Sequence, residues 1–255
     1  MSERENGIPP VLAMAWGLRE RPGKGPRPGL TLERIVAAGV KVAATEGLGA
    51  VSMARVAKEL GAATMSLYRH LNAKDELLDL MVDHAIGQPP PLPPGQDWRT
   101  GLAAFARTYL ALLRDQPWIA RVPINTPPIT PNQIAWMDHG LETMRGTALH
   151  QYERLSSIMI ISGLTRNWAL LTADIDAAAR AGGGSTEQAM LGYSRLLRRF
   201  ADPARFPAVG DLIASGVLDH PAEIPDDDFE FGIARFLDGL EALMQRRIRD
   251  NGRKT

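Results

Sequence analysis

Residues 51–74, VSMARVAKELGAATMSLYRHLNAK, contain the pattern that most restricts how this chain folds. Ser52 is a favourable N-cap for a short helix, and Gly61 stands where that helix would end in a left-handed turn. Apolar residues recur at helical spacing on both sides of this glycine, at Val56, Ala57, Leu60, Leu67 and Leu71. The pattern predicts two short helices that pack against each other across a tight turn.

The second of these helices also carries a mostly polar set of residues that the apolar positions leave facing solvent. Its members are Thr64, Met65, Ser66, Tyr68, Arg69 and His70. Helix-turn-helix units place such a helix in the major groove of DNA. Taken singly, Tyr68 is equally compatible with a half-buried core tyrosine, and His70 and Lys74 with ordinary surface residues. Their joint spacing behind Gly61 favours the DNA interpretation.

A proline-rich run, GQPPPLPPGQ at 87–96, divides the helical patterns into two groups. Proline interrupts helices and favours extended spacers, so we expect a linker over 88–96. Before it, helical spacing covers about 31–46, with Thr31 as N-cap and Gly47 as terminator, and again 74–86. After it, helices are expected near 98–114, 132–147, 151–180, 186–201 and 227–249. No period-2 strand stands out, and the predicted class is all-α.

Composition limits the function classes only weakly. The 255 residues contain 29 basic and 29 acidic side chains and no cysteine, which excludes disulfides and thiolate metal sites. The absence of a secretory signal and of an apolar run near the roughly 18 residues of a membrane span leads us to expect a cytoplasmic protein without membrane contact. Residues 1–30 are rich in Gly and Pro, with bases that include Arg21, Lys24 and Arg27. This flexible segment is either a solvated tail or a basic arm that contacts DNA.

The sequence LYRHL at 67–71, followed by Lys74 and the helix start DELL, resembles the TetR family of bacterial repressors. The resemblance covers about 31–87 and implies a three-helix helix-turn-helix DNA-binding domain. By the same resemblance, base-reading positions fall on Thr64, Met65, Ser66 and Arg69. Phosphate-contacting positions fall on Tyr68, His70 and Lys74, and the Ser52 backbone N–H suits the same role. Ala63, in a place where a capping serine is frequent, raises the alternative that Thr64 caps the helix instead of reading bases.

Residues 97–255 resemble, in layout, the larger ligand-binding and dimerisation domain of tetracycline-repressor-like proteins. The resemblance implies a homodimer on a palindromic double-stranded operator, released by a small-molecule effector. Polar and aromatic residues in or beside the helical core are candidate pocket residues or, equally, core packing: Trp136, Met137, His139, Met159, Asn167 and Trp168. Expected dimer-interface residues on the long and last helices are Leu164, Trp168, Leu171, Ile233, Leu237, Leu240 and Met244. Gly232 and Gly239, seven apart, mark either a close helix approach or an exposed face.

Catalytic constellations are weak by comparison. His150 and Glu153 lie one helical turn apart, but no third metal ligand accompanies them. We therefore expect no enzyme activity, no metal and no cofactor. The alternatives are a helical ligand-binding or scaffold protein without DNA binding and, last, a helical enzyme.

Overall fold

The computed structural model describes residues 10–18, 30–125, 127–219 and 226–252, and every regular element within them is a helix. This confirms the all-α prediction. The chain divides into two compact units, residues 1–162 and 163–255, and the division falls inside the long helix α8 (Gln151–Ala181). Within the described residues, no helix has the length and apolar character needed to cross a lipid bilayer.

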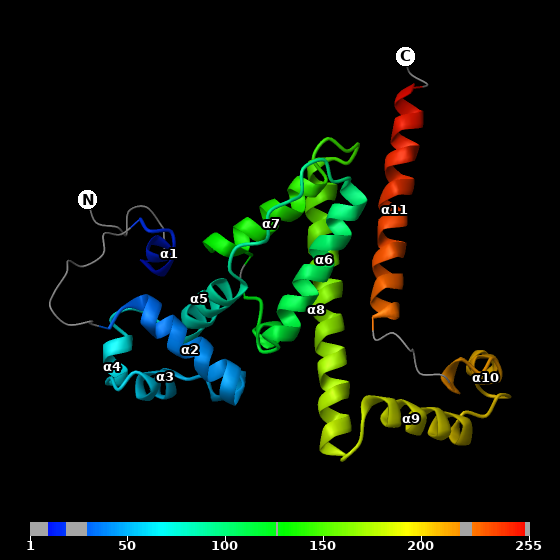
Figure 1. The fold of residues 1–255 in the computed structure, drawn as a ribbon, viewed down its shortest axis with the longest axis horizontal. Helices are drawn as coiled ribbons and strands as arrows, with labels where there is room; N and C mark the ends of the chain where they lie inside the picture. Colours follow the sequence, from blue (N-terminus) through cyan, green and yellow to red (C-terminus); the bar gives the residue numbers. More distant parts are fainter. Residues whose placement is uncertain (1–9, 19–29, 126, 220–225, 253–255) are drawn as a thin grey trace. The chain divides into compact units, whose positions relative to one another are not determined.

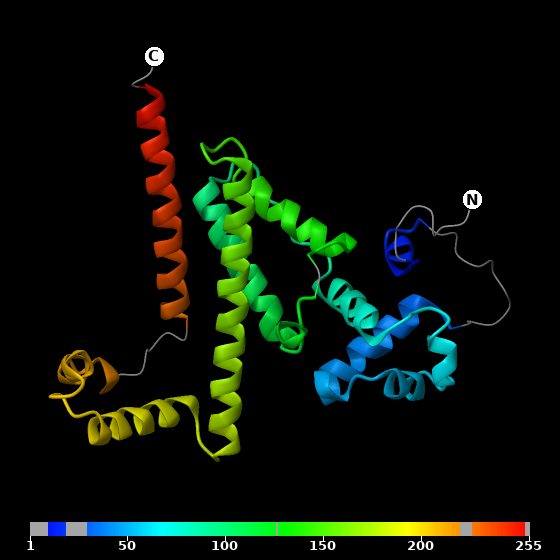
Figure 2. The ribbon, with the colours of Figure 1, turned by 180° about the vertical axis from the view of Figure 1, so that it is seen from behind.

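The first unit contains the predicted helix-turn-helix region (Figures 1 and 2). Its helices are α2 (Leu32–Glu46), α3 (Met53–Glu59) and α4 (Thr64–Leu67), with a 3₁₀ turn η2 (Leu48–Ala50) after α2, and α5 (Lys74–Ile86) packs on α2. A β-carbon at Gly39 would lie 2.6 Å from the Met81 sulfur, so glycine at this position permits the close approach of α2 and α5.

Local sequence signals set the ends of these helices as predicted. The Thr31 hydroxyl accepts the Arg34 N–H at 3.3 Å, and the Ser52 hydroxyl accepts the Arg55 N–H at 3.1 Å. Gly61 follows α3 with φ +63°, a left-handed conformation that costs a residue with a side chain more than glycine. Helix α4 is only four residues long, and turn bonds from the His70 and Leu71 N–H groups to the Leu67 carbonyl continue it.

Beyond the proline-rich run, the first unit continues with α6 (Trp98–Asp115), η3 (Ile119–Arg121), α7 (Pro131–Thr143) and the start of α8. Helix α7 ends four residues earlier than expected, since residues 144–148 form turns and bends. A β-carbon at Gly140 would lie 2.5 Å from Ile158 and 3.3 Å from Phe105. Glycine there lets α7 pack closely against side chains of α6 and α8.

The N-terminal segment differs from the expectation of a wholly flexible arm. A six-residue helix α1 (Pro10–Ala15) precedes Trp16, whose indole N–H donates to the Ile129 carbonyl at 3.0 Å. This partner lies 113 residues away in sequence, so no local pattern could have indicated it. The predicted arm residues Arg21, Lys24 and Arg27 lie outside the described residues.

The second unit contains the rest of α8, then α9 (Thr186–Phe200), α10 (Pro207–Ala214), a 3₁₀ turn η4 (Val217–Asp219) and α11 (Asp227–Gly252). Ser185 and Gln188 form a capping box at the start of α9. The short α10 was not predicted. A β-carbon at Gly232 would lie 3.9 Å from Leu164, whereas nothing lies within 4 Å of one at Gly239. In this unit, therefore, Gly232 faces α8 at ordinary contact distance, and Gly239 lies on an exposed face.

Candidate nucleic-acid interface

Burial separates the two faces of residues 52–74, which we call the α4 segment, as the sequence predicts. The side chains of Leu67 and Leu71 are buried, and Met65, two residues before Leu67, is 73% exposed. Tyr68, between the two leucines, is 45% exposed. The leucines therefore anchor the segment and direct the intervening residues to solvent.

The remaining predicted DNA contacts lie on the exposed side or at its border. Ser52, Arg69 and Lys74 are exposed, while Thr64, Ser66 and His70 are half-buried. In the described part of the chain, neither Arg69 nor Lys74 makes an ion pair. Both cations are thus available to an external anion or base edge.

Thr64 is the first residue of α4 and does not cap it. The N-cap is Ala63, which has no side-chain bond to offer. The alternative in which Thr64 caps the helix is therefore wrong, and the Thr64 hydroxyl remains available to contact a base. Ser52 differs, because its hydroxyl is used to cap α3.

A carboxylate that sequence analysis did not single out fixes the turn before Lys74. Glu76 accepts the Asn72 backbone N–H at 2.7 Å and the Asn72 side-chain N–H at 2.9 Å. The N-cap of α5, Ala73, makes no side-chain bond, and these bonds instead tie the residue before Ala73 to the third residue of the helix. They hold Lys74 at the first turn of α5, where helix N–H groups and the ammonium favour a phosphate together.

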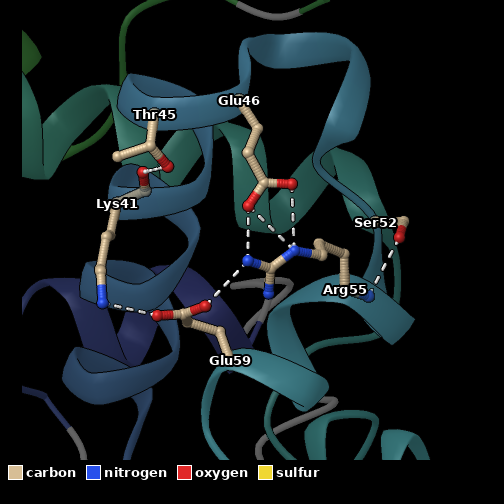
Figure 3. Close-up of polar contacts among 6 residues, drawn as sticks. All are labelled: Lys41, Thr45, Glu46, Ser52, Arg55 and Glu59. Atoms are coloured by element: carbon tan, nitrogen blue, oxygen red, sulfur yellow. Dashed lines mark hydrogen bonds and ion pairs between the residues drawn. The ribbon is translucent and has the colours of Figure 1, made fainter.

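A four-residue charge network joins α2 to α3 (Figure 3). Arg55 donates to both Glu46 oxygens from Nε at 3.1 Å and to Glu59 at 2.9 Å, and Lys41 pairs with Glu59 at 2.7 Å. The Arg55 guanidinium lowers the pKa of Glu46, whereas Lys41 first and Arg55 second lower that of Glu59. Arg55 and Glu59 are four residues apart, a spacing at which helix side chains commonly pair. The second partner of Arg55, Glu46, lies on another helix, and sequence spacing does not indicate it.

This network pairs two acids of the helix-turn-helix region with bases of the same region. Glu46 and Glu59 are neutralised within the domain by Arg55 and Lys41. The exposed side of the α4 segment consequently presents Arg69, His70 and Lys74 without these carboxylates as competitors. Arg suits the guanine edge, and Tyr and Lys suit phosphate oxygens.

Polar bonds join the C-terminal end of α5 to the N-terminal end of α7. The Asp83 Oδ1 atom accepts the backbone N–H groups of Asn132 at 2.8 Å and Gln133 at 3.2 Å. In the other direction, the Trp136 indole N–H donates to the Gly87 carbonyl at 3.0 Å. Each helix thus supplies the other with a cap. The sequence offered no signal for this, because the partners are about 50 residues apart.

Four aromatic rings gather where α6 faces α7. Phe105 lies 5.8 Å from Trp136 and 6.1 Å from His139, and Tyr109 lies 5.7 Å from Trp136, all between ring centroids. Burial lowers the pKa of His139, with Asp138 acting weakly in the opposite direction. The lowered pKa favours the uncharged imidazole at neutral pH, the form suited to contact a ring or to form one directed hydrogen bond.

The other predicted pocket residues lie in different surroundings. Met137 on α7 is half-buried, and Met159 on α8 is 67% exposed. In the second unit, Asn167 is exposed, while Trp168 packs against Phe229 with its indole nitrogen buried. That nitrogen has no hydrogen-bond partner among the described residues.

The predicted dimer-interface residues differ widely in exposure. Ile233, Leu237 and Met244 are buried within the chain, Leu164, Trp168 and Leu240 are half-buried, and Leu171 is 47% exposed. The long helix α8 carries further exposed apolar side chains that the predicted set omits, namely Tyr152, Leu155 and Ile160.

The described residues contain no cluster of three His, Cys, Asp or Glu side chains that could hold a metal ion. His150 and Glu153, the pair considered above as metal ligands, are joined by a hydrogen bond: the Glu153 carboxylate accepts the His150 backbone N–H at 2.6 Å.

Comparison with known proteins agrees with this architecture along both parts of the chain. Residues 35–81 match the family described as "Bacterial regulatory proteins, tetR family", and residues 90–244 match "Tetracyclin repressor-like, C-terminal domain". The HTH-type transcriptional repressor DrrR1 of Streptomyces coeruleorubidus is 37% identical over 93% of this chain and 87% of its own length. The class A tetracycline repressor from transposon 1721 of Escherichia coli is 28% identical over 76% of this chain and 82% of its own.

Among solved structures, the TetR family protein ActR of Streptomyces coelicolor in complex with actinorhodin superposes with a TM-score of 0.69 at 26% identity. The match covers 84% of this chain and 98% of ActR. A second ActR structure, in complex with (S)-DNPA, gives a TM-score of 0.67 over the same shares. From its exposed α4 residues to its matched C-terminal region, this chain belongs to the TetR family of bacterial transcriptional regulators.

Proposed function

We propose that this protein is a ligand-responsive transcriptional repressor that binds a palindromic operator as a homodimer and leaves it when a small molecule binds. The observation that carries the proposal is the α4 segment, in which buried Leu67 and Leu71 hold Tyr68 and Arg69 toward solvent. One such domain contacts one half of an operator. Two copies, set about one helical turn of DNA apart, therefore match the two halves of a palindrome. Membership of a family of regulators favours this function over a helical enzyme or scaffold.

Within the interface, the residues divide by chemistry. Arg69 is the principal base reader, supported by Thr64, Met65 and Ser66. Tyr68, His70 and Lys74 contact phosphates, and the bonds from Asn72 to Glu76 position Lys74. Arg55 does not read DNA directly, because its guanidinium is engaged by Glu46 and Glu59.

Operator binding is tested by salt titration against duplexes selected from a random library. Arg69→Ala should cost about 1–3 kcal/mol on the selected site and relax one base position. Tyr68→Phe with Lys74→Ala should weaken all sequences alike and lower the salt slope by about 1 for each lost phosphate contact. Arg246→Ala on α11, an exposed arginine far along the chain, is the matched control. Equal affinity of the parent protein for selected and random duplexes would refute the proposed repressor function.

The effector site is proposed at the aromatic cluster of Phe105, Tyr109, Trp136 and His139. Stacked and tilted rings with one neutral imidazole suit a flat, largely apolar molecule with a few polar atoms. ActR was solved in complex with actinorhodin and with (S)-DNPA, so these compounds are the first to test. Met137 and Met159, in the same unit, remain predicted contacts of this site. Asn167 and Trp168 belong to the second unit, and their place in a pocket stays a separate prediction. Quenching of tryptophan fluorescence that disappears in Trp136→Phe but persists in Trp118→Phe would support the site; identical quenching in both variants would move it elsewhere.

The homodimer is proposed to use apolar side chains that a single chain leaves in solvent. In the second unit these are Leu171 on α8 and Phe231 and Ile248 on α11, which are 47%, 64% and 61% exposed. The half-buried Leu164, Trp168 and Leu240 border them, and the buried Ile233, Leu237 and Met244 support them from within. Sedimentation should give a dimer at micromolar concentration, and Leu171→Glu should produce a monomer. A monomeric parent protein would contradict this arrangement.

A further inference from the structure

The residue before α7, Thr130, has a side chain suited to cap this helix, but that side chain makes no capping bond. Thr130 is the N-cap residue, and the order Thr130, Pro131, Asn132, Gln133 is the sequence pattern of a capping box. In such a box the threonine hydroxyl accepts an N–H from the second or third helical residue. Those residues are Asn132 and Gln133. Their N–H groups donate instead to Asp83 of α5.

The displaced hydroxyl is left without a partner. Thr130 is 1% exposed, and its Oγ1 atom makes no hydrogen bond within the described residues. A buried hydroxyl that loses its bond is costly unless another arrangement can satisfy it. The other half of the box is nearly in place, because the Gln133 side chain accepts the neighbouring Ile129 N–H at 3.3 Å. A self-capped helix therefore forms when Asp83 leaves the two N–H groups and the Thr130 hydroxyl turns toward them.

We propose that the N-terminus of α7 is a two-state switch in which Asp83 and Thr130 compete for the same two N–H groups. In the joined state, Asp83 caps α7 and fixes the end of α5 beside it, as seen here. In the released state, Thr130 caps α7, its hydroxyl gains a partner, and Asp83 is free to move away with α5. Asp83 and Thr130 are positioning residues, since both act on DNA through α5 and not by touching it.

Two further bonds make the joined state depend on the position of α5. Trp136 donates to the Gly87 carbonyl, and the Asn132 side-chain N–H donates to the Asp83 carbonyl at 2.8 Å. The hydroxyl of Thr130 lowers the cost of breaking the Asp83 bonds, because the helix N–H groups exchange one acceptor for another. Trp136 also belongs to the aromatic cluster, so a molecule that displaces its indole shifts the balance toward release. This last step rests on the proposed effector function; the competition between caps does not.

The competition is tested by a double-mutant cycle in the full-length protein, read as denaturant unfolding. Thr130→Val should leave the unfolding constant unchanged or lower it in the parent, because the lost hydroxyl has no partner. In the Asp83→Ala background it should raise the unfolding constant about fivefold, the usual effect of losing an N-cap. Thr143→Val on the same helix, whose hydroxyl donates to the Gly140 carbonyl at 2.7 Å, should have the same effect in both backgrounds.

Equal effects of Thr130→Val in both backgrounds would overturn the proposal. If Asp83→Ala does not fold, Asp83→Asn replaces it, since its oxygen is a weaker, uncharged acceptor. Amide exchange at Asn132 and Gln133 then gives the second measurement. Thr130→Val should accelerate exchange there more in the Asp83→Asn background than in the parent, and no difference would again overturn the proposal.

The link to DNA is tested with a duplex selected by the parent protein. Asp83→Ala favours release and Thr130→Val favours the joined state, so the two should shift specific affinity in opposite directions and leave affinity for random duplex unchanged. Shifts of the same sign, or none, would overturn the link. If the parent shows no specific binding at all, the repressor function fails, while the unfolding cycle still decides whether the caps compete.

Discussion

The α4 segment and the α5–α7 junction lie in the same unit but are built by opposite means. In the α4 segment, residues within about 20 positions of one another determine the structure: Ser52 caps, Gly61 turns, and Leu67 and Leu71 are buried. At the junction, the decisive bonds join residues 49 or 50 positions apart, across the proline-rich spacer. The proposed DNA-reading surface is thus determined by nearby residues, whereas its connection to the rest of the unit depends on contacts that form only in the folded chain.

The largest expected effect is that of removing Leu67, one of the two buried leucines that fix the α4 segment. Leu67→Ala removes a fully buried side chain and should lower the free energy of unfolding by about 2–5 kcal/mol, measured by urea denaturation. Met65→Ala, on the exposed face two residues earlier, should leave stability nearly unchanged and alter only DNA binding. Comparable stability losses in both variants would mean that the two faces are not separated as described.

The junction is tested by removing its indole donor. Trp136→Phe loses the bond to the Gly87 carbonyl and some packing, and should cost about 1–3 kcal/mol. Trp118→Phe is the matched control, because its buried indole donates only two residues away, to Gln116 at 2.9 Å. Both should lower stability, but only Trp136→Phe should accelerate hydrogen exchange at the end of α5. Faster exchange there in the control would contradict a specific role for the Trp136 bond.

The charge network between α2 and α3 predicts a pH dependence of stability. Glu46 and Glu59 have lowered pKa values, so their pairing stabilises the fold above their unfolded values near 4.5 and is lost as pH falls through the lower folded values. Arg55→Met should therefore reduce the melting temperature most at neutral pH, and the difference from the parent should narrow below pH 4.5. A pH-independent difference would mean that Arg55 contributes packing alone.

The smallest expected effect concerns Asp79 on α5, between the two regions. Burial first, and then Asp75 and Glu76, raise the pKa of this carboxyl. A raised folded pKa penalises the ionised form at neutral pH, and the penalty disappears as pH falls through that value toward the unfolded one. Asp79→Asn should raise the melting temperature slightly at pH 7 and not at pH 3. A lower melting temperature at pH 7 would show that the carboxylate makes a favourable contact.

Sequence reasoning predicted most of the helices and the exposed face of α4 because both follow from short-range periodicity and caps. It missed α1 and α10, which are short and lie in proline-containing segments, and it expected α7 to run four residues further. No local pattern distinguishes Glu76 and Asp83 from other acids, because their partners depend on turn geometry or on distant backbone groups. Residues 130–133 have the sequence pattern of a capping box, but nothing in the nearby sequence indicates that Asp83 accepts the N–H groups of Asn132 and Gln133.

The reciprocal caps at the α5–α7 junction also constrain the construction of hybrid regulators. The proline-rich spacer is an obvious place to exchange the operator-reading half of one repressor for another. A graft cut there would separate Asp83 and the Gly87 carbonyl from their partners Asn132, Gln133 and Trp136. A working chimera therefore needs donor and recipient matched at these positions, so compatibility between halves becomes a property of five residues that neither half reveals alone.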